Sequence, residues 1–112
     1  MTATEVVQRQ LDAYNRRDLD AFVATYSDDV VVFRMPAPEP ALTGKAQLAE
    51  FYRTKRFNEP KLRAELLQRI VTGNKVIDHE RITGLGNDPV EAVAVYEVDG
   101  AVIRRVWFFY PA

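Results

Sequence analysis

Four consecutive polar residues, Asp78-His79-Glu80-Arg81, stand within an otherwise apolar stretch of the chain. Val76 and Ile77 precede them, and Ile82 follows them. We expect this stretch to be a strand, in which alternate side chains point to opposite faces of a sheet. Polar groups in the middle of a sheet need partners, because a buried unpaired one costs ~1–3 kcal/mol. The stretch therefore either holds ion pairs within the sheet or lines a pocket.

Acid–base and anion-binding chemistry are the functions that these residue types suggest. Histidine changes charge near neutral pH, so His79 is the candidate general base or proton shuttle. Arg81 and Arg105 are the candidates for binding a carboxylate or stabilising developing negative charge. The alternatives are structural. His79 would be hydrogen-bonded to Gln68 or a tyrosine, and each arginine would pair with a carboxylate across the sheet.

The other candidate ligand contacts are aromatic, small or polar residues that the expected fold brings beside these three. They are Tyr14, Tyr26, Phe33, Phe51, Tyr52, Gln68, Ala92, Ala94, Tyr96, Trp107 and Phe109. The two alanines leave room in a curved sheet, and aromatic and polar groups around such room are typical of a ligand site. The aromatic residues are equally consistent with plain core. Among them, Tyr14 and Tyr52 are the better candidates for presenting a hydroxyl group inward.

Composition excludes several other classes of protein. The chain has 112 residues, which suggests one domain spanning residues 1–112. It has no cysteine and a single histidine, which excludes disulfides, thiol catalysis and multi-histidine or cysteine-ligated metal sites. Asp28-Asp29 indicates a turn between a helix and a strand rather than a metal site. The net charge of −1 gives no reason to expect nucleic acid or a membrane surface as partner. We expect no cofactor, and a cytoplasmic location because no apolar run is long enough for a signal peptide or a membrane span.

The first half of the chain predicts three helices and one strand. Thr2 and Glu5 form a capping box, and Asp18 caps a second helix that ends at Ser27-Asp28-Asp29. A third helix begins at Thr43-Gly44. The strand covers residues 30–33. Three prolines make residues 35–42 a loop, either a lid over the pocket or a stiff connector.

The second half predicts an antiparallel meander of four strands, over residues 62–72, 75–84, 90–98 and about 101–110. Hairpin turns at Gly73-Asn74 and Asp99-Gly100 set the pairing. The first turn places Arg69 opposite Asp78, Gln68 opposite His79 and Leu66 opposite Arg81. The second turn places Ala94 opposite Arg105, Ala92 opposite Trp107 and Tyr96 opposite Ile103. An even number of residues in the loop at 85–89 pairs His79 with Ala94 and Arg81 with Ala92, whereas an odd number exchanges the two faces.

The even loop predicts that His79, Arg81 and Arg105 face a pocket and that Asp78 and Glu80 face outward. The outward carboxylates would then form a structural network with Arg69 and Arg104. Both faces of the sheet carry many apolar residues, whereas a sheet exposed on one side has a clean polar face. Three helices can cover only one face. We therefore expect a homodimer formed through the outer face of the sheet.

The chain resembles the nuclear transport factor 2-like superfamily over essentially its whole length, and within it the SnoaL-like and ketosteroid-isomerase-like proteins. The segments that carry this resemblance are residues 14–22 and 26–30, the proline loop, Thr43-Gly44-Lys45, Phe51-Tyr52 and residues 106–109. The resemblance implies an α+β fold, a cone-shaped curved antiparallel sheet wrapped around three N-terminal helices. It also implies a pocket inside the cone and a dimer across the outer face.

The catalytic positions of the family depart in this chain. The resemblance aligns Arg34 with the aspartate base of ketosteroid isomerases, Gln10 with their oxyanion tyrosine and Ala94 with their neutral aspartic acid. Arg81 matches the arginine of limonene-epoxide-hydrolase-like proteins, but Thr83 and Trp107 replace the carboxylates of that site. The aspartate base of the SnoaL-type cyclases has no clear counterpart. Steroid isomerisation and epoxide hydrolysis by those mechanisms are therefore not expected.

Two functions follow from these observations. The first is a small-molecule-binding domain with isomerase- or cyclase-like acid–base chemistry on a small oxygenated or anionic substrate. His79 would transfer protons, and Arg81 or Arg105 would stabilise negative charge. The second is a non-catalytic ligand-binding or dimerisation module, because this superfamily hosts both enzymes and binders.

Overall fold

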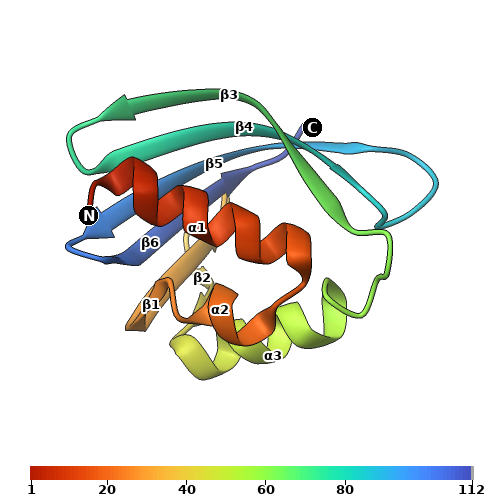
Figure 1. The fold of residues 1–112 in the computed structure, drawn as a ribbon, viewed down its shortest axis with the longest axis horizontal. Helices are drawn as coiled ribbons and strands as arrows, with labels where there is room; N and C mark the ends of the chain where they lie inside the picture. The colour runs from red at the N-terminus through yellow and green to blue at the C-terminus, as the bar shows by residue number, and fades with distance from the viewer. Residues whose placement is uncertain (112) are drawn as a thin grey trace.

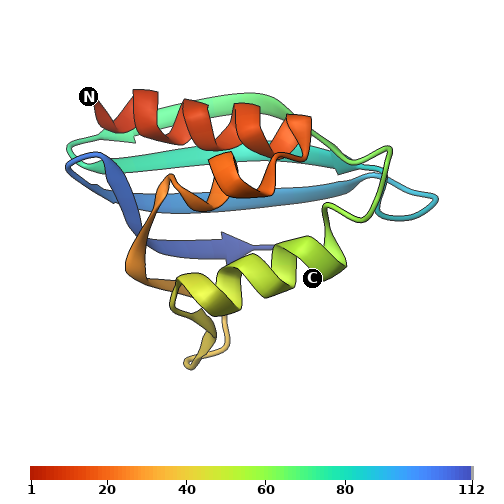
Figure 2. The same ribbon diagram turned by 60° about the horizontal axis from the view of Figure 1, so that its bottom comes forward.

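The computed structural model describes residues 1–111. Its elements in chain order are α1 (Ala3–Arg16), α2 (Leu19–Val23), β1 (Tyr26–Arg34), β2 (Pro40–Thr43), α3 (Lys45–Lys55), β3 (Arg63–Thr72), β4 (Lys75–Thr83), β5 (Val90–Asp99) and β6 (Val102–Phe109). The strands form one curved, unclosed sheet in the order β2-β1-β6-β5-β4-β3. All three helices lie on the same side of this sheet (Figures 1 and 2). The predicted α+β fold is confirmed.

The meander is also confirmed, because β3, β4, β5 and β6 pair in sequence and antiparallel. The sheet as a whole is mixed, since β1 pairs with β6 in parallel. This corrects the expectation of a purely antiparallel sheet. The parallel pair is possible because β1 and β6 are separated by most of the chain, whereas a hairpin can join only antiparallel strands.

Local signals place the helices. Glu5 N–H donates to the Thr2 hydroxyl at 3.1 Å, and Thr2 N–H donates to the Glu5 carboxylate at 2.9 Å, so the capping box is present. Asp18 caps α2 through the N–H of Ala21, at 3.1 Å. This helix ends at Val23, earlier than predicted, and Tyr26 already belongs to β1. No helix within residues 1–111 is both long enough and apolar enough to cross a membrane.

The proline-rich segment contains a short strand that the sequence did not predict. Pro40–Thr43 pairs antiparallel with β1 at the edge of the sheet. Proline lacks a backbone N–H and is tolerated at such an edge, where that group is not needed for pairing. The prediction that residues 35–42 are entirely loop was therefore wrong at its C-terminal end.

The register of β4 against β5 is the correction with the largest consequence. Asp78 lies opposite Ala94, Glu80 opposite Ala92, and His79 opposite Val93. The last pair before the connecting loop is Ile82–Val90, so the loop has an odd number of residues. A shift of one residue moves every side chain of a strand to the other face. The prediction that His79 and Arg81 share a face with the two alanines was wrong.

Two bulges shift the other pairs. Arg69 lies opposite Asp78 and Gln68 opposite His79 as predicted, but a bulge beyond them places Leu66 opposite Glu80 instead of Arg81. The last hairpin turns at residues 100–101 rather than 99–100, and a second bulge follows. Its pairs are Tyr96–Val106, Ala94–Phe108 and Val95–Trp107, which correct the predicted Tyr96–Ile103, Ala94–Arg105 and Ala92–Trp107.

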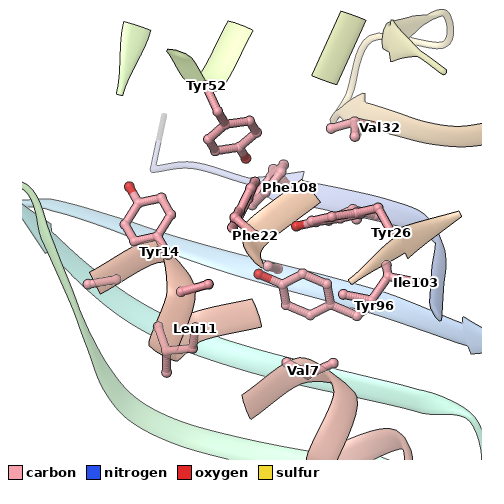
Figure 3. Packing of buried hydrophobic residues seen from close by; sticks show 14 of the residues in the cluster. Val7, Leu11, Tyr14, Phe22, Tyr26, Val32, Tyr52, Tyr96, Ile103 and Phe108 are labelled. Atoms are coloured by element: carbon pink, nitrogen blue, oxygen red, sulfur yellow. The ribbon is translucent and has the colours of Figure 1, made fainter. Parts of the chain in front are cut away.

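The core lies between the helices and the concave face of the sheet. Figure 3 shows aromatic rings from α1, α2, α3, β1 and β5 entering this space from several sides. Phe22 is at its centre, with its ring centroid 4.6 Å from that of Tyr52, 5.1 Å from Tyr26 and 6.0 Å from Tyr14. Four tyrosines therefore bring hydroxyl groups into an otherwise apolar interior, and they define the region of the candidate site.

Candidate functional site

A small cavity lies among these side chains, between the helices and the sheet. Its volume is about 30 Å³, which is room for one or two water molecules. The residues that line it are Gln10, Leu11, Tyr14, Arg34, Tyr52, Arg56, Ala64, Glu80, Ile82, Tyr96, Phe108 and Tyr110. We call this space the inner cavity. Most of its lining comes from α1, α3 and the sheet, so the fold as a whole positions it.

Glu80 is the titratable carboxyl group of the inner cavity. Its residue is only 5% exposed, and its side chain forms no hydrogen bond with any of residues 1–111. Burial, together with the negative charge of Asp78, raises the pKa of Glu80 to about 7, while the positive charge of Arg69 opposes the rise. A carboxyl group with this pKa both accepts and donates protons near neutral pH.

Asp78, two residues before Glu80 on β4, is fully buried but paired. Arg69 donates to its two carboxylate oxygens, from Nε to Oδ1 at 2.7 Å and from Nη2 to Oδ2 at 2.9 Å. Arg69 Nη1 also donates to the side chain of Gln8 on α1, at 2.8 Å. The network fixes β3 and β4 to α1. It also places the negative charge of Asp78, which is paired with Arg69, two residues from Glu80 on the same strand.

The hydroxyl groups of Tyr14, Tyr26, Tyr52 and Tyr96 remain protonated at all ordinary pH values. The pKa of each is raised, mainly by burial, and the charge of Glu80 adds to the rise in all four. Three of them, Tyr14, Tyr52 and Tyr96, line the inner cavity with Glu80. A protonated phenol is a hydrogen-bond donor. The cavity therefore contains one carboxyl group with a pKa of about 7, that of Glu80, and several hydroxyl groups that can donate hydrogen bonds.

Two arginines lie at another part of the cavity lining, next to α3. The Cζ atom of Arg34 lies 4.7 Å from the ring centroid of Phe51, and that of Arg56 lies 5.0 Å from the same point. Neither guanidinium forms an ion pair with a carboxylate of residues 1–111. Tyr110, which follows β6, is 39% exposed and marks the side on which the cavity approaches solvent.

Two polar atoms of the lining residues are buried without a partner in the described part of the chain. They are Oε1 of Gln10 and Nε of Arg34. An unpaired buried polar atom costs about 1–3 kcal/mol, and such atoms are rare in folded proteins. One is an acceptor and the other a donor. The cavity therefore holds unused hydrogen-bonding capacity of both kinds.

The predicted catalytic residues lie on the opposite, outer face of the sheet. His79 Nε2 is 2.6 Å from an oxygen of Glu91, Arg81 lies 3.5 Å from Glu65, and Arg105 Nη1 donates to Glu97 at 2.8 Å. All three side chains are more than 40% exposed. The prediction that they face the pocket was wrong, because the odd loop and the bulges exchange the faces. Pairing with a carboxylate was the alternative reading of the two arginines, and the structure shows it.

The predicted ligand contacts divide into three groups. Tyr14, Tyr52 and Tyr96 line the inner cavity. Tyr26, Ala92 and Ala94 are buried on the inner side but are not among the lining residues. The others lie away from the cavity: Phe33 stacks on Trp107 with ring centroids 6.0 Å apart, Gln68 and Phe109 are exposed, and Phe51 supports the arginines outside the lining.

Sequence reasoning missed most of the cavity lining as site candidates, including its charged residues Glu80, Arg34 and Arg56 and the amide of Gln10. Glu80 was assigned to the outer face with Asp78. One signal would have found it: Val76 and Ile82 are apolar, and they alternate with Asp78 and Glu80 as members of one face. Gln10 and Arg34 occupy the positions that the family resemblance aligns with a catalytic tyrosine and aspartate. Both side chains belong to the lining of the inner cavity.

No group of three or more potential ligands among His, Cys, Asp and Glu gathers anywhere in residues 1–111 to hold a metal ion. The polar functional groups of the inner cavity come from its lining residues. These are one carboxyl group that titrates near neutral pH, four phenols, two guanidinium groups and the amide of Gln10.

Comparisons with known proteins agree with this architecture. A protein of cystatin fold from Novosphingobium aromaticivorans is 24% identical, covers 96% of this chain and 97% of its own, and has a TM-score of 0.87. A SnoaL-like protein of unknown function from Burkholderia thailandensis is 22% identical, with coverages of 98% and 94% and a TM-score of 0.81. A protein with a ketosteroid isomerase-like fold from Catenulispora acidiphila, in complex with trimethylamine, is 14% identical, with coverages of 98% and 87% and a TM-score of 0.80. These identities show the fold alone.

The family follows from the sequence comparison. No curated protein matches the chain. The family model described as a SnoaL-like domain matches residues 7–106, which is most of the chain and includes Glu80, Tyr14, Tyr52 and Tyr96. The chain therefore belongs to the SnoaL-like domain family, with the nuclear transport factor 2-like fold.

Proposed function

We propose that this SnoaL-like domain binds a small carbonyl compound in the inner cavity and that Glu80 transfers a proton to and from it. The observation that carries this proposal is the state of Glu80, which is buried, without a hydrogen-bond partner among residues 1–111, and has a pKa raised to about 7. A general base is most effective when its pKa is close to the working pH. Glu80 takes the role that the sequence suggested for His79.

The reaction class is proton abstraction from a carbon next to a carbonyl group. The Glu80 carboxylate takes the proton, and the electron pair of the C–H bond forms the enolate. The carbonyl oxygen, now negatively charged, accepts a hydrogen bond from a tyrosine hydroxyl, and Tyr14, Tyr52 and Tyr96 are the donors in the lining. Protonated Glu80 then returns the proton to the same carbon or to a conjugated one. The second outcome is an isomerisation.

The volume of the inner cavity constrains the substrate. A cavity of about 30 Å³ is far below the ~300–1,000 Å³ of typical ligand pockets. The substrate must be compact, and the wall near Tyr110 and Arg56 has to move outward to admit it. A multi-ring substrate does not fit this interior. The proposal is thus limited to small molecules.

The test is deuterium exchange, which needs no knowledge of the natural substrate. Small ketones and oxo acids are incubated with the protein in D₂O, and loss of the signal of the proton next to the carbonyl is followed by NMR. The wild-type protein accelerates exchange in at least one compound, and Glu80→Gln abolishes the acceleration. Glu91→Gln, which changes a carboxylate on the outer face, keeps it. Full exchange activity in Glu80→Gln would contradict the proposal.

A second candidate function is non-catalytic ligand binding. Two observations favour it: the small cavity, and the Gln10 and Arg34 side chains at positions where the resemblance expects catalytic groups. This function predicts that compounds raise the melting temperature of the protein without any of them exchanging protons faster. The same compound panel therefore separates the two candidates.

We also propose that the domain is a homodimer through the outer face of its sheet. This face carries Ile77, Val93, Val95 and Trp107, and none of the helices covers it. The charged groups on this face, such as Arg105 and Glu97, are already paired within the chain. An apolar surface with neutralised charges is suited to burial against a second copy.

A further inference from the structure

We propose that the ligand of the inner cavity is a monocarboxylate whose carboxylate group is bound by Arg34 and Arg56. This inference rests on the proposed function, because it names the substrate class of the same cavity. The two guanidinium groups are part of the lining, on the side of α3 and Tyr110. They make one part of the lining positively charged, whereas Glu80 supplies a carboxyl group to another part.

The guanidinium groups of Arg34 and Arg56 both line the inner cavity and lack a carboxylate partner in residues 1–111. Arg69, Arg53 and Arg105 each have a carboxylate within 2.9 Å. Arg34 and Arg56 have no such partner in residues 1–111, although both approach the same ring of Phe51. Within residues 1–111, the side chain of Arg56 donates only to the backbone carbonyl of its neighbour Lys55. Two positive charges that line one cavity without a counter-ion favour the binding of an anion there.

The Nε–H group of Arg34 is buried and has no acceptor in the described chain. The face of Phe51 attracts the cation but does not accept the several N–H groups of a guanidinium. A planar, bidentate acceptor satisfies Nε–H and a terminal N–H together. A carboxylate has this shape, and the arginine–carboxylate pair is the common bidentate one.

The carboxyl group of Glu80 disfavours the binding of a doubly charged anion in the cavity. Glu80 and Asp78 place carboxyl groups on the sheet side, and Asp78 is compensated by Arg69. A dianion such as phosphate would be repelled by ionised Glu80, whereas a monoanion held at the arginines extends its neutral part toward it. The wall between the two ends is aromatic, from Tyr14, Tyr52 and Phe108. The neutral part of the ligand is therefore short and weakly polar.

The positions of the charges agree with this polarity. The pKa of Tyr52 is raised by burial, and Arg56 and Arg34 both oppose the rise, so their positive charges reach its hydroxyl group. The charged groups that influence the pKa of Glu80 are Asp78 and Arg69. A carboxylic acid with a carbonyl group a few atoms along its chain meets the arginines, the phenols and Glu80 in that order.

The experiment compares acids with matched neutral compounds by calorimetry and by ligand-detected NMR. The probes are acetate, 2-oxobutyrate and benzoate against acetamide, butanone and benzamide, with inorganic phosphate as the dianion. We expect at least one acid to bind at least tenfold more tightly than its neutral counterpart and more tightly than phosphate. Arg34→Gln and Arg56→Gln each weaken that binding at least fivefold. Arg63→Gln, at an exposed arginine of β3 outside the cavity lining, leaves it unchanged.

The outcomes separate this inference from the proposed function. Glu80→Gln keeps or strengthens the binding of acids, because it removes a negative charge, while it abolishes proton exchange. Equal affinities for the acids and their neutral counterparts, or tighter binding of phosphate, would overturn the carboxylate inference even if Glu80-dependent exchange of butanone persists. Arg34→Lys serves where Arg34→Gln melts early, because it keeps the charge but not the bidentate geometry. Undiminished acid binding in both arginine variants would also overturn the inference.

Discussion

Arg69 and Asp78 form a two-point ion pair in the interior, with N–O distances of 2.7 and 2.9 Å. The side chain of Asp78 is 0% exposed and that of Arg69 is 13% exposed. Their residues are directly opposite each other on β3 and β4. The pair is the reason that a charged residue can occupy the inner face of β4 next to Glu80. It also connects the stability of the sheet to the electrostatics of the inner cavity.

Removal of Arg69 is therefore predicted to be strongly destabilising. Arg69→Met leaves the Asp78 carboxylate buried without its partner, which costs about 3–5 kcal/mol in the free energy of unfolding. Urea unfolding at pH 7 measures this loss. The matched control is Arg105→Met, which breaks an exposed pair with Glu97 and costs below about 1 kcal/mol. Equal losses in the two variants would contradict the assignment of the Arg69 pair to the interior.

Glu80 predicts a specific dependence of stability on pH. Its pKa rises from 4.5 to about 7 on folding, so the folded state binds a proton that the unfolded state releases between these values. The favourable contribution of protonated Glu80 is fully present below pH 4.5 and is lost as pH rises through 7. The loss is roughly 3 kcal/mol, from about 1.4 kcal/mol for each pH unit of the shift.

Glu80→Gln tests this dependence, because glutamine is a neutral residue of the same shape. Urea unfolding at pH 8 should show the variant to be more stable than the wild-type protein, and the difference should shrink toward zero near pH 5. Glu91→Gln, on the exposed outer face, should show no such pH-dependent gain. A Glu80→Gln protein that is less stable than wild type at pH 8 would show that the carboxylate has a partner that stabilises its charge.

The helices and the order of the last four strands could be predicted because local residues determine them. Thr2 with Glu5 and Asp18 satisfy the free N–H groups of the helix starts, and this needs no knowledge of the rest of the fold. Glycine at residues 73 and 100 has positive φ angles of 57° and 63°, which mark the turns of the hairpins. The sequence also predicts that the tyrosines lie in the interior, either as core residues or as ligand contacts.

The faces of the sheet could not be predicted, because each depends on a count of single residues. The turn after Asp99 lies one residue later than its strongest local signal, and two bulges, at Leu66–Gln68 and Glu97–Val98, each change the pairing again. A shift of one residue moves a carboxylate from solvent to the interior. The assumption of an even loop at residues 85–89 put Asp78 and Glu80 on the outer face, whereas the paired strands have an odd loop. Arg69 and Gln8, which make the burial of Asp78 possible, come from β3 and α1.

The proposed dimer predicts an assembly of two chains that a charge on the outer face disrupts. Val95→Arg places an uncompensated positive charge at the middle of the apolar surface, opposite Trp107 of the neighbouring strand. Light scattering coupled to size exclusion should report twice the chain mass for the wild-type protein and the single mass for the variant. Ala101→Lys, in the exposed turn between β5 and β6, should leave the dimer intact. A wild-type protein that is a monomer at micromolar concentration would contradict the proposal.

Gly84 offers a test of the loop that orients Asp78 and Glu80 toward the interior. It follows directly after β4, has a φ angle of 90°, and a Cβ atom at this position would lie 2.3 Å from the backbone oxygen of Lys61. Neither the φ angle nor the contact with backbone is tolerated by alanine, so Gly84→Ala should cost roughly 2–4 kcal/mol. Gly86→Ala in the same loop meets no atom within 4 Å and should change stability by less than about 0.5 kcal/mol.

The two glycine variants also report on the inner cavity. A Cβ atom at Gly84 would push the end of β4 away from the backbone of Lys61, and β4 is the strand that carries Glu80. Deuterium exchange of the ketone panel should therefore fall in Gly84→Ala, in proportion to the folded fraction or more steeply, and stay at the wild-type rate in Gly86→Ala. Chemical denaturation of both variants supplies the folded fraction. A Gly84→Ala protein with wild-type stability would mean that the end of β4 does not depend on the tight approach of residue 84 to Lys61.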